Sequence, residues 1–346
     1  MKLKTATLLM VFVCFLTFSQ GHTYKIHTVA FYNLENLFDT INEPNTNDEA
    51  SPIFEIKNNR SSVYWQKINN LSRVISEIGT EKTQAPPSII GVAEIENRAV
   101  LEDLIASEKL ADFPYEIVHH NSPDKRGIDV ALLYNKQKFI PIHHSTYELK
   151  LWSENGYRIY TRDQLLVSGY LENELIHVVV NHWPSRRGGE KKSNSLREKA
   201  AFLNKKICDS LLQSDSNSKI ILMGDLNDNP TNSSLKKVLQ AEKNMKKVTD
   251  TTFFNPYEIL YKKGLGTLGY RDNIHLFDQI LLNGNFLSKK KETLSFYKAY
   301  IYNPQYLTQQ SGKYKNYPFR SFSNGAFTNG YSDHYPVYIY LIKKVN

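Results

Sequence analysis

The sequence predicts an α/β fold in which mixed or antiparallel β-sheets carry helices on their outer faces. Short apolar segments recur along the 346-residue chain and predict strands. Some of these segments are separated by hairpin-length gaps, whereas helix-length segments separate others. A doubly wound parallel sheet needs a crossover helix between successive strands, so this mixture argues against that architecture.

Eight strands and two long helices are predicted in order along the chain. The strands are apolar runs at residues 26–32, 88–93, 130–134, 165–170, 175–180, 219–223, 277–282 and 337–342. The helices are predicted by three- and four-residue spacing of Trp65, Ile68, Leu71, Ile75 and Ile78, and of Leu196, Ala200, Leu203, Ile207 and Leu211. Ser195 and Glu198 form a capping-box pattern, which predicts that the second helix begins there.

The start of the chain has the pattern of a secretory signal peptide. Lys2 and Lys4 precede an apolar run from Leu8 to Phe18, and small or polar residues follow. This order predicts that residues 1–21 are removed and that the protein is secreted or periplasmic. The apolar run is too short to span a membrane comfortably, which argues against an anchor.

The rest of the chain, residues 22–346, is interpreted as a single domain because it contains no internal repeat, linker or low-complexity block. No later segment approaches the roughly 18 apolar residues of a membrane span, so no stable membrane insertion is expected. The composition implies no protein partner, and we expect a monomer. After cleavage Cys208 is the only cysteine, which excludes an internal disulfide. The formal net charge of +8 favours polyanionic partners.

Polar side chains recur where the predicted strands end. They are Asn33, Glu94, His182, Asp225, Asn227, Asp278, Asp333 and His334. Any one of them is consistent with a turn or a strand cap, but eight at strand boundaries are harder to explain in that way. Carboxylate and amide oxygens suit a hard cation such as Mg²⁺, Mn²⁺ or Ca²⁺ better than zinc. The two histidines add groups for proton transfer or for stabilising an oxyanion.

Seven short motifs carry a resemblance to a known family. They are Phe31–Asn36, Ala93–Arg98, Arg126–Ala131, Asn181–Pro184, Gly224–Asn227, Phe277–Gln279 and Ser332–His334. In this order they resemble the exonuclease–endonuclease–phosphatase superfamily, which includes pancreatic-type deoxyribonuclease, abasic-site endonucleases, bacterial sphingomyelinases and inositol polyphosphate phosphatases. The resemblance covers nearly all of residues 26–342. It implies a four-layer α/β sandwich, with two packed mixed or antiparallel β-sheets flanked by helices and an active site where strand ends converge.

The resemblance also implies roles for the residues that match the motifs. Glu94 matches the principal metal ligand, with Asn33 and Asp333 as further oxygen ligands for Mg²⁺. Asp225 would orient or deprotonate the attacking water, and Asn227 would hold the scissile phosphate.

The two histidines match phosphate-binding positions. His334 would contact the phosphate oxygens and would be oriented by Asp278. His182 matches the second histidine of the deoxyribonuclease-like and sphingomyelinase-like branches. Asp129 begins a neighbouring predicted strand and is the candidate partner that fixes the His182 ring, although a turn cap after Gly127 is an equally good interpretation.

Basic residues follow His182 directly and suggest how a substrate is held. Arg186 and Arg187 lie in a loop that also contains two glycines and two lysines. Next to a phosphate site, we expect one of these arginines to bind a substrate phosphate. Arg162 is a second candidate. The aromatic segment from Tyr297 to Tyr331 is consistent with a rim for bases or lipid, and equally with packing of a long loop.

The sequence therefore predicts a secreted Mg²⁺-dependent phosphodiesterase, with a nuclease as the leading interpretation. Such an enzyme would hydrolyse DNA or RNA by metal-assisted in-line attack of water, with nucleic acid as its partner. The first alternative is a phosphatase or a lipid phosphodiesterase on the same scaffold, sphingomyelinase-like or acting on inositol phosphates. The second is a non-catalytic binding protein, against which the complete set of catalytic residues argues.

Overall fold

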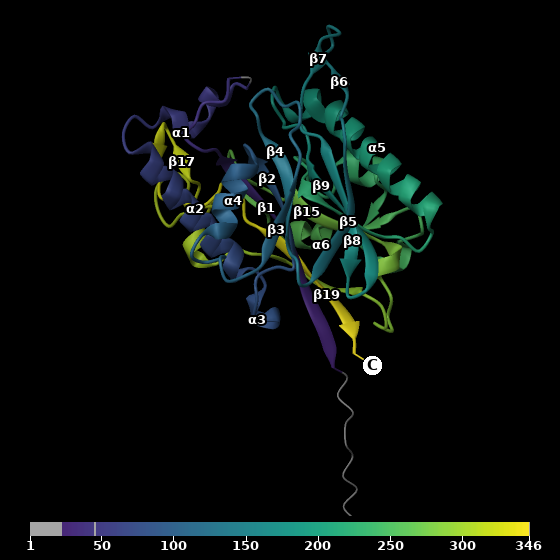
Figure 1. The fold of residues 1–346 in the computed structure, drawn as a ribbon. Helices are drawn as coiled ribbons and strands as arrows, with labels where there is room; N and C mark the ends of the chain where they lie inside the picture. The colour runs from purple at the N-terminus through teal and green to yellow at the C-terminus, as the bar shows by residue number, and fades with distance from the viewer. Residues whose placement is uncertain (1–22, 45, 346) are drawn as a thin grey trace, which may run out of the picture.

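Two β-sheets packed face to face form the centre of the computed structural model, which describes residues 23–44 and 46–345 (Figure 1). The first sheet has six strands in the spatial order β16 (Ser295–Ile301), β19 (Val337–Lys344), β1 (Tyr24–Leu37), β2 (Ile89–Ile95), β4 (Asp129–Asn135) and β3 (Tyr115–His119). The second has seven, in the order β11 (Ala241–Glu242), β12 (Phe253–Phe254), β15 (Asp278–Asn283), β10 (Lys219–Asp225), β9 (Glu174–His182), β8 (Gln164–Leu171) and β5 (Phe139–Tyr147).

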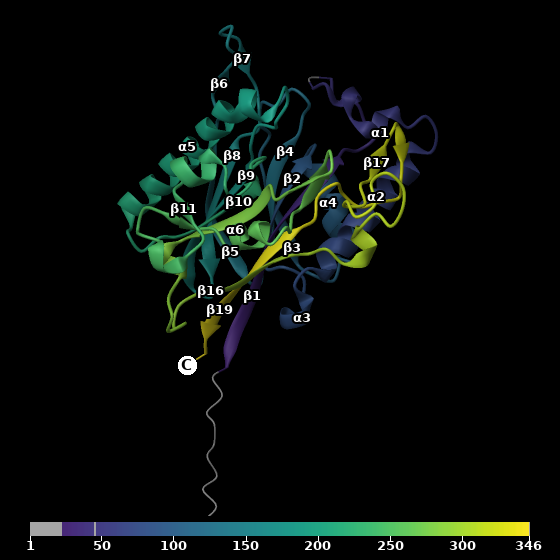
Figure 2. The ribbon, with the colours of Figure 1, turned by 180° about the vertical axis from the view of Figure 1, so that it is seen from behind.

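Both sheets are mixed, as predicted. The pairs β1–β2, β9–β10 and β11–β12 are parallel, and the remaining pairs within these two sheets are antiparallel. Figure 2 shows β1, β16 and β19 running together, and the register pairs Tyr24 with Lys344. The two ends of the described chain therefore meet at one end of the first sheet.

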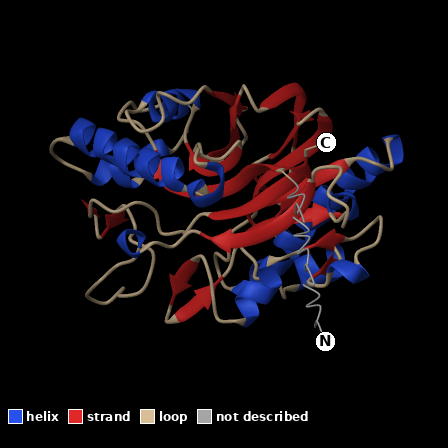
Figure 3. Ribbon diagram, turned by 90° about the horizontal axis from the view of Figure 1, so that it is seen from below, coloured by secondary structure: helices blue, strands red, loops and turns tan. Residues whose placement is uncertain are grey.

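Helices cover the outer face of each sheet and complete the four layers (Figure 3). The helices α2 (Arg60–Glu77) and α4 (Arg98–Ala106) pack on the first sheet, and α5 (Glu190–Ser214) packs on the second. The other helices are shorter: α1 (Pro52–Glu55), α3 (Thr80–Thr83) and α6 (Tyr257–Lys262). None of the helices in the described residues is long and apolar enough to cross a lipid bilayer.

Short hairpins and single turns decorate this sandwich. The hairpins are β6 (Leu151–Trp152) with β7 (Arg158–Ile159), β13 (Leu268–Tyr270) with β14 (Asn273–His275), and β17 (Phe322–Ser323) with β18 (Ala326–Phe327). The single turns are η1 (Asp48–Ala50), η2 (Ser234–Val238), η3 (Met245–Lys247), η4 (Gly284–Phe286) and η5 (Gln305–Leu307). The predicted signal peptide lies outside the described residues.

Period-two alternation along the strands divides the core into an inter-sheet layer and two sheet–helix layers. On β1, Val29 and Phe31 belong to the apolar cluster between the sheets, whereas Ala30 and Tyr32 pack toward α2 and α4. On β10, Ile221 and Met223 belong to the same inter-sheet cluster. Alternate residues of a strand face the same side, so the next alternate residue after the last apolar one lies at the end of the inter-sheet core.

Two details of the predicted helices are wrong. The helix α5 begins at Glu190, so the Ser195 capping pattern lies inside it. An acidic residue in the first turn interacts favourably with the helix dipole, which favours the earlier start. In α2, Trp65 is exposed and the preceding Tyr64 is buried in its place. Spacing by itself does not decide which of two adjacent aromatic residues faces the sheet.

Candidate active site

The inter-sheet core ends in polar side chains, because four strands have a polar residue at the inward-facing position just beyond their apolar residues. These residues, which we call the polar cluster, are Asn33 on β1, His182 on β9, Asp225 on β10 and Asp278 on β15. Each is at most 5% exposed. They lie at the end of the sheets opposite the carboxyl terminus. The predicted convergence of strand ends is therefore observed for these four residues.

Glu94 reaches the polar cluster through an irregularity in β2. The pairing of β2 with both neighbouring strands shifts at this point, and Glu94 has a φ of +61°. Bulges of this kind redirect a side chain, and a non-glycine residue in the left-handed region costs roughly 1–3 kcal/mol. Regular alternation would direct Glu94 toward the helices. The bulge instead brings its Oε1 atom to 3.8 Å from Nε2 of His182.

Asp225 lies at the centre of the cluster. Its Oδ2 atom accepts a hydrogen bond from Nδ2 of Asn33 at 3.2 Å and lies 3.5 Å from Nε2 of His182 and 3.9 Å from Nε2 of His334. Its Oδ1 atom accepts a bond from the backbone N–H of Asn227 at 3.0 Å. Burial raises the pKa of Asp225 to about 7, with Asp278 adding to the increase and His334 opposing it.

His334 is held by Asp278, as predicted. Its Nδ1 atom lies 2.7 Å from Oδ2 of Asp278, and both side chains are buried. Burial by itself would lower the pKa of His334. The carboxylates of Asp278 and Asp225 outweigh burial and raise the pKa well above 6.5. These neighbours favour the protonated ring of His334, whose Nε2 lies 3.9 Å from Oδ2 of Asp225.

His182 has different surroundings, and the predicted partner is wrong. Asp129 accepts hydrogen bonds from Nε2 of His119 at 2.9 Å and from the backbone of Ser122 at 2.8 Å. Nδ1 of His182 is buried and has no hydrogen-bond partner among the described residues. Burial and the guanidinium groups of Arg162 and Arg126 lower the pKa of His182 well below 6.5.

Arg162 holds the strand end behind His182, whereas we expected it to face a substrate. Its guanidinium donates to the carbonyl oxygens of His182 at 3.2 Å and Trp183 at 2.6 Å, and to Oδ2 of Asp124 at 3.0 Å. It is 5% exposed. These bonds use all three nitrogens of the guanidinium. Arg162 therefore positions His182 and leaves little capacity for a direct phosphate contact.

The two arginines of the following loop have separate environments. Arg186 donates to the backbone carbonyl of Asn227 at 2.9 Å and is paired with Asp228 and Glu190. These bonds tie the loop to Asn227, so Arg186 supports the site from within the protein. Arg187 is exposed and lines a surface pocket of about 470 Å³. Of the two, only Arg187 keeps the predicted freedom to bind substrate.

Asp333 lies at the edge of the site and joins a half-buried ion cluster that sequence reasoning missed. Its Oδ2 atom pairs with Arg320 at 3.1 Å, and Arg320 also pairs with Glu35. Lys67 donates to the backbone carbonyl of Glu35 at 2.5 Å and to Oγ of Ser321 at 2.8 Å. Within the described chain, no hydrogen bond or ion pair joins Asp333 to Asn33 or Glu94. A lysine in an amphipathic helix normally indicates exposure, so no signal identified Lys67 as buried.

Burial sets the protonation tendencies of this ion cluster. It raises the pKa of Glu35 to about 7, with Asp333 adding to the increase. It lowers the pKa of Lys67 to about 8, opposed by Glu35. Glu35 lies two residues after Asn33, a predicted metal ligand, and this position is the one feature of the sequence that indicated a place near the site. The cluster connects β1 to the loop that carries Asp333.

Two groups of side chains could hold a divalent cation. Ligand atoms of Asp225, Asp278 and His334 lie within 4.8 Å of one another. However, Nδ1 of His334 already bonds Asp278, and a hard cation prefers oxygen to imidazole nitrogen. Glu94 engages only Oε2 with a backbone N–H, and its Oε1 lies 3.8 Å from Nε2 of His182, the ring that also faces Asp225. This oxygen-rich group fits Mg²⁺ or Mn²⁺ better.

The chain belongs to the endonuclease/exonuclease/phosphatase family, whose family model matches residues 28–343. Members of this family are metal-dependent hydrolases of phosphodiesters and phosphate esters. The prediction from the ordered motifs is therefore confirmed at the level of the family and of enzymatic class. Among curated protein sequences, none matches this chain significantly.

Solved structures share the fold at low sequence identity. An endonuclease/exonuclease/phosphatase family protein from Bacteroides thetaiotaomicron has a TM-score of 0.54 and 16% identity, and the match covers 94% of this chain and 100% of that one. D. rerio TDP2 complexed with single strand DNA product has a TM-score of 0.53 and 12% identity, covering 91% and 98%. A mannosyl-6-phosphatase from B. thetaiotaomicron has a TM-score of 0.52 and 18% identity, covering 91% and 99%.

Proposed function

We propose that this protein is a Mg²⁺-dependent nuclease that hydrolyses phosphodiester bonds of DNA or RNA at the polar cluster. A pair of cationic pockets, one on each side of that cluster, carries the proposal. The pocket on the His182 side contains Lys125, Arg126 and Arg187 together with Arg162. The pocket on the His334 side, of about 640 Å³, contains three basic residues, Arg271, Lys313 and Arg320, and two acidic ones, Asp272 and Asp333.

A polymeric substrate has phosphates on both sides of the bond that is cleaved, so two flanking cationic pockets suit it better than a single small ester. Aromatic side chains also lie in both pockets: Tyr160 on the His182 side, and Tyr270 and Tyr314 on the other. Bases stack on such rings with little dependence on sequence. The D. rerio TDP2 structure contains single strand DNA product, which agrees with this substrate class for the shared fold.

The residues of the cluster divide the chemistry between them. A bound divalent cation, held by Glu94 and Asn33, would stabilise the negative charge that develops on the phosphate oxygens. Asp225, with its pKa near 7, is suited to accept a proton from the attacking water. The protonated ring of His334 supplies a charged donor for a phosphate oxygen. Nδ2 of Asn227 donates to the carbonyl oxygen of Trp183 at 3.0 Å, which fixes the side-chain amide that would contact the substrate phosphate.

The experiment is an activity screen with Mg²⁺ on plasmid DNA, single-stranded RNA, sphingomyelin, inositol phosphates and a sugar monophosphate. We expect cleavage of a polynucleotide to be fastest. The charge-reversal variant Arg271→Glu/Arg126→Glu should lose polynucleotide cleavage while retaining hydrolysis of bis-p-nitrophenyl phosphate. Faster turnover of a small phosphate ester than of DNA or RNA would assign the site to a phosphatase instead.

We also infer that the enzyme acts outside the cytoplasm, on the basis of the signal-peptide pattern in residues 1–21. Expression of the full chain in a secreting bacterial host tests this. Amino-terminal sequencing should find a mature protein that begins shortly after residue 19 in the periplasm or medium. Recovery of only the uncleaved chain from the cytoplasm would contradict the inference.

A further inference from the structure

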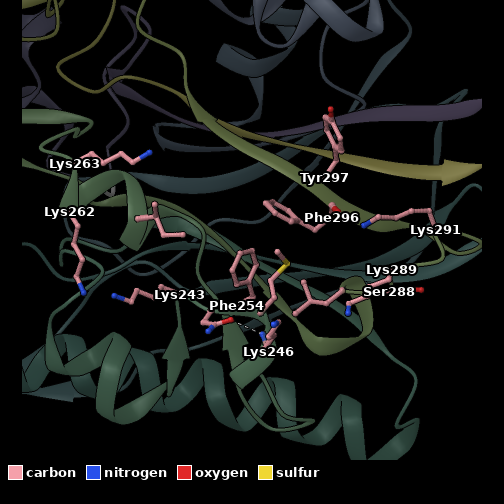
Figure 4. Close-up of a pocket in the computed structure, with 14 residues that line it drawn as sticks. Lys243, Lys246, Phe254, Lys262, Lys263, Ser288, Lys289, Lys291, Phe296 and Tyr297 are labelled. Carbon is pink, nitrogen blue, oxygen red and sulfur yellow. Dashed lines mark hydrogen bonds between the residues drawn. The ribbon is translucent and has the colours of Figure 1, made fainter.

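A third pocket, drawn in Figure 4, is unconnected with the proposed catalysis and lies at the other end of the second sheet. We call it the lysine pocket after its six lysines, Lys243, Lys246, Lys262, Lys263, Lys289 and Lys291. Phe254, in its wall, pairs with Leu282 of β15, four residues along that strand from Asp278. At the rise of a β-strand, this separation is roughly 13 Å along the sheet. The pocket is therefore distinct from the polar cluster.

The interior of the lysine pocket is apolar. Phe254 and Phe296 meet edge to face, with ring centroids 5.1 Å apart, and Leu287 lies beside them. Met245 and Ile259 line the same pocket and are 49% and 42% exposed. Figure 4 shows the labelled lysines distributed around the two phenylalanine rings. The volume of about 960 Å³ and the apolar wall are typical of sites for small organic ligands.

Most of the charge around this apolar wall has no carboxylate partner in the described chain. None of the residues that line the pocket is acidic. No carboxylate of the described chain lies within 4.0 Å of Nζ of Lys243, Lys246 or Lys289, whereas Lys262 pairs with Glu258 at 2.7 Å. An anion placed among these groups would pair with ammonium groups that have no carboxylate partner.

We propose that the lysine pocket binds one amphipathic anion, a fatty-acid-like molecule whose chain covers the apolar wall and whose head lies among the lysines. The positive charge of the lysines favours an anionic head group. The exposed apolar side chains of Met245 and Ile259 favour a ligand with a hydrocarbon chain that covers them. A simple anion would leave that apolar surface in water, and a neutral lipid would leave the lysines unpaired. A concave pocket also suits a single molecule better than the surface of a bilayer.

Binding is tested by titration calorimetry of the mature chain with laurate below its micelle concentration. Acetate serves as the head without a chain, and monolaurin as the same chain with a neutral head. We expect one laurate per chain, no detectable acetate binding, and monolaurin bound at least tenfold more weakly. The variant Lys243→Glu/Lys289→Glu should weaken laurate at least tenfold. Ile259→Asp should weaken it as well.

A matched control separates local from general charge effects. Lys57→Glu/Lys199→Glu changes the net charge equally at exposed lysines elsewhere, and should bind laurate like the wild type. Hydrolysis of bis-p-nitrophenyl phosphate and the melting temperature should be unchanged in all of these variants, which verifies folding. Equal affinity for laurate and monolaurin, or unchanged laurate binding in Lys243→Glu/Lys289→Glu, would overturn the proposal. Displacement of laurate by a short single-stranded oligonucleotide would assign the pocket to nucleic acid instead.

Discussion

The two buried histidines of the site approach the same carboxylate from contrasting surroundings. Nε2 of His182 and of His334 lie 3.5 Å and 3.9 Å from Oδ2 of Asp225. Beyond the ring, His334 meets the carboxylate of Asp278, whereas His182 meets no hydrogen-bond partner within the described chain and has Arg162 nearby. Both rings are buried at a similar distance from Asp225, so that distance does not explain why their pKa values shift in opposite directions. The groups on the far side of each ring account for the difference.

This difference gives the site a side whose histidine favours the protonated ring, which we call the charged side, and a side whose histidine favours the neutral ring, which we call the neutral side. His334 and Asp278 form the charged side, where a protonated ring can donate to a phosphate oxygen. His182 and Glu94 form the neutral side, where the carboxylate is directed into the site by the bulge in β2. Breaking each side separately tests whether the two histidines have different tasks.

The largest effect is expected on the neutral side, from Glu94→Gln. Loss of the carboxylate removes the principal candidate ligand for the cation, and several kcal/mol of charge stabilisation corresponds to a rate lowered about 10³-fold or more. Steady-state hydrolysis of bis-p-nitrophenyl phosphate measures it. EDTA should abolish wild-type activity, and Mg²⁺ or Mn²⁺ should restore it. Full activity in EDTA would contradict the metal-dependent mechanism for this chain.

The charged side is broken by Asp278→Asn. The amide no longer favours the protonated ring of His334, so kcat should fall about 10²-fold or more. His334→Ala should have a similar effect, and the double variant should be little worse than either single variant. Losses that multiply in the double variant would indicate that Asp278 acts independently of His334.

Arg162→Met should act mainly on stability. Removing the guanidinium leaves Oδ2 of the buried Asp124 without its ion-pair partner, while Oδ1 keeps the backbone N–H of Arg126 at 2.9 Å and its side chain at 3.4 Å. Breaking a buried pair costs about 3 kcal/mol or more. Urea unfolding measures the free energy, and Arg187→Met is the control that should leave it unchanged. If Arg162→Met unfolds like the wild type but binds substrate poorly, the original prediction of a phosphate contact is restored.

Titration should separate the two histidines directly. In the metal-free protein, NMR of the ring protons should find His334 titrating above pH 6.5 and His182 below it. The proton on His334 stabilises the fold fully below pH 6.5, and this contribution is lost as the pH rises through its folded-state pKa. His182 has the opposite effect, since the fold loses stability as the pH falls from 6.5 toward its lowered pKa. Matching midpoints would remove the distinction between the two sides.

The smallest effect is expected from Arg187→Ala. Loss of one phosphate contact should flatten the dependence of log K on log salt by roughly 0.7 to 0.9 for any nucleic-acid sequence. Stability should not change, because the side chain is exposed. Arg186→Ala should instead cost about 1–3 kcal/mol of folding free energy, since it leaves a buried carboxylate on Asp228 with fewer partners. A flattened salt dependence in Arg186→Ala without lost stability would reverse these assignments.

Much of the fold could be predicted because burial of a strand leaves a local pattern. Apolar runs located eight strands of the two sheets to within a few residues but missed β3, β5 and β16. Period-two alternation accounts for the position of Asn33, His182, Asp225 and Asp278 at the end of one core layer. The pairing of His334 with Asp278 also agrees with the motif order. The start of α5 could not be located, because a helix terminus depends on weak local interactions that several positions satisfy.

The amino-acid sequence by itself determined the family, the layered architecture and the identity of the polar residues at the strand ends, because strand periodicity and ordered motifs are local properties of the chain. Tertiary structure alone decided which partner each side chain meets. It directed Glu94 into the site through a bulge, gave Asp129 to His119, placed Arg162 behind His182 and gathered lysines from separate elements around an apolar wall. Residues distant in sequence become neighbours only through packing, and pKa values and ion pairs depend on those neighbours.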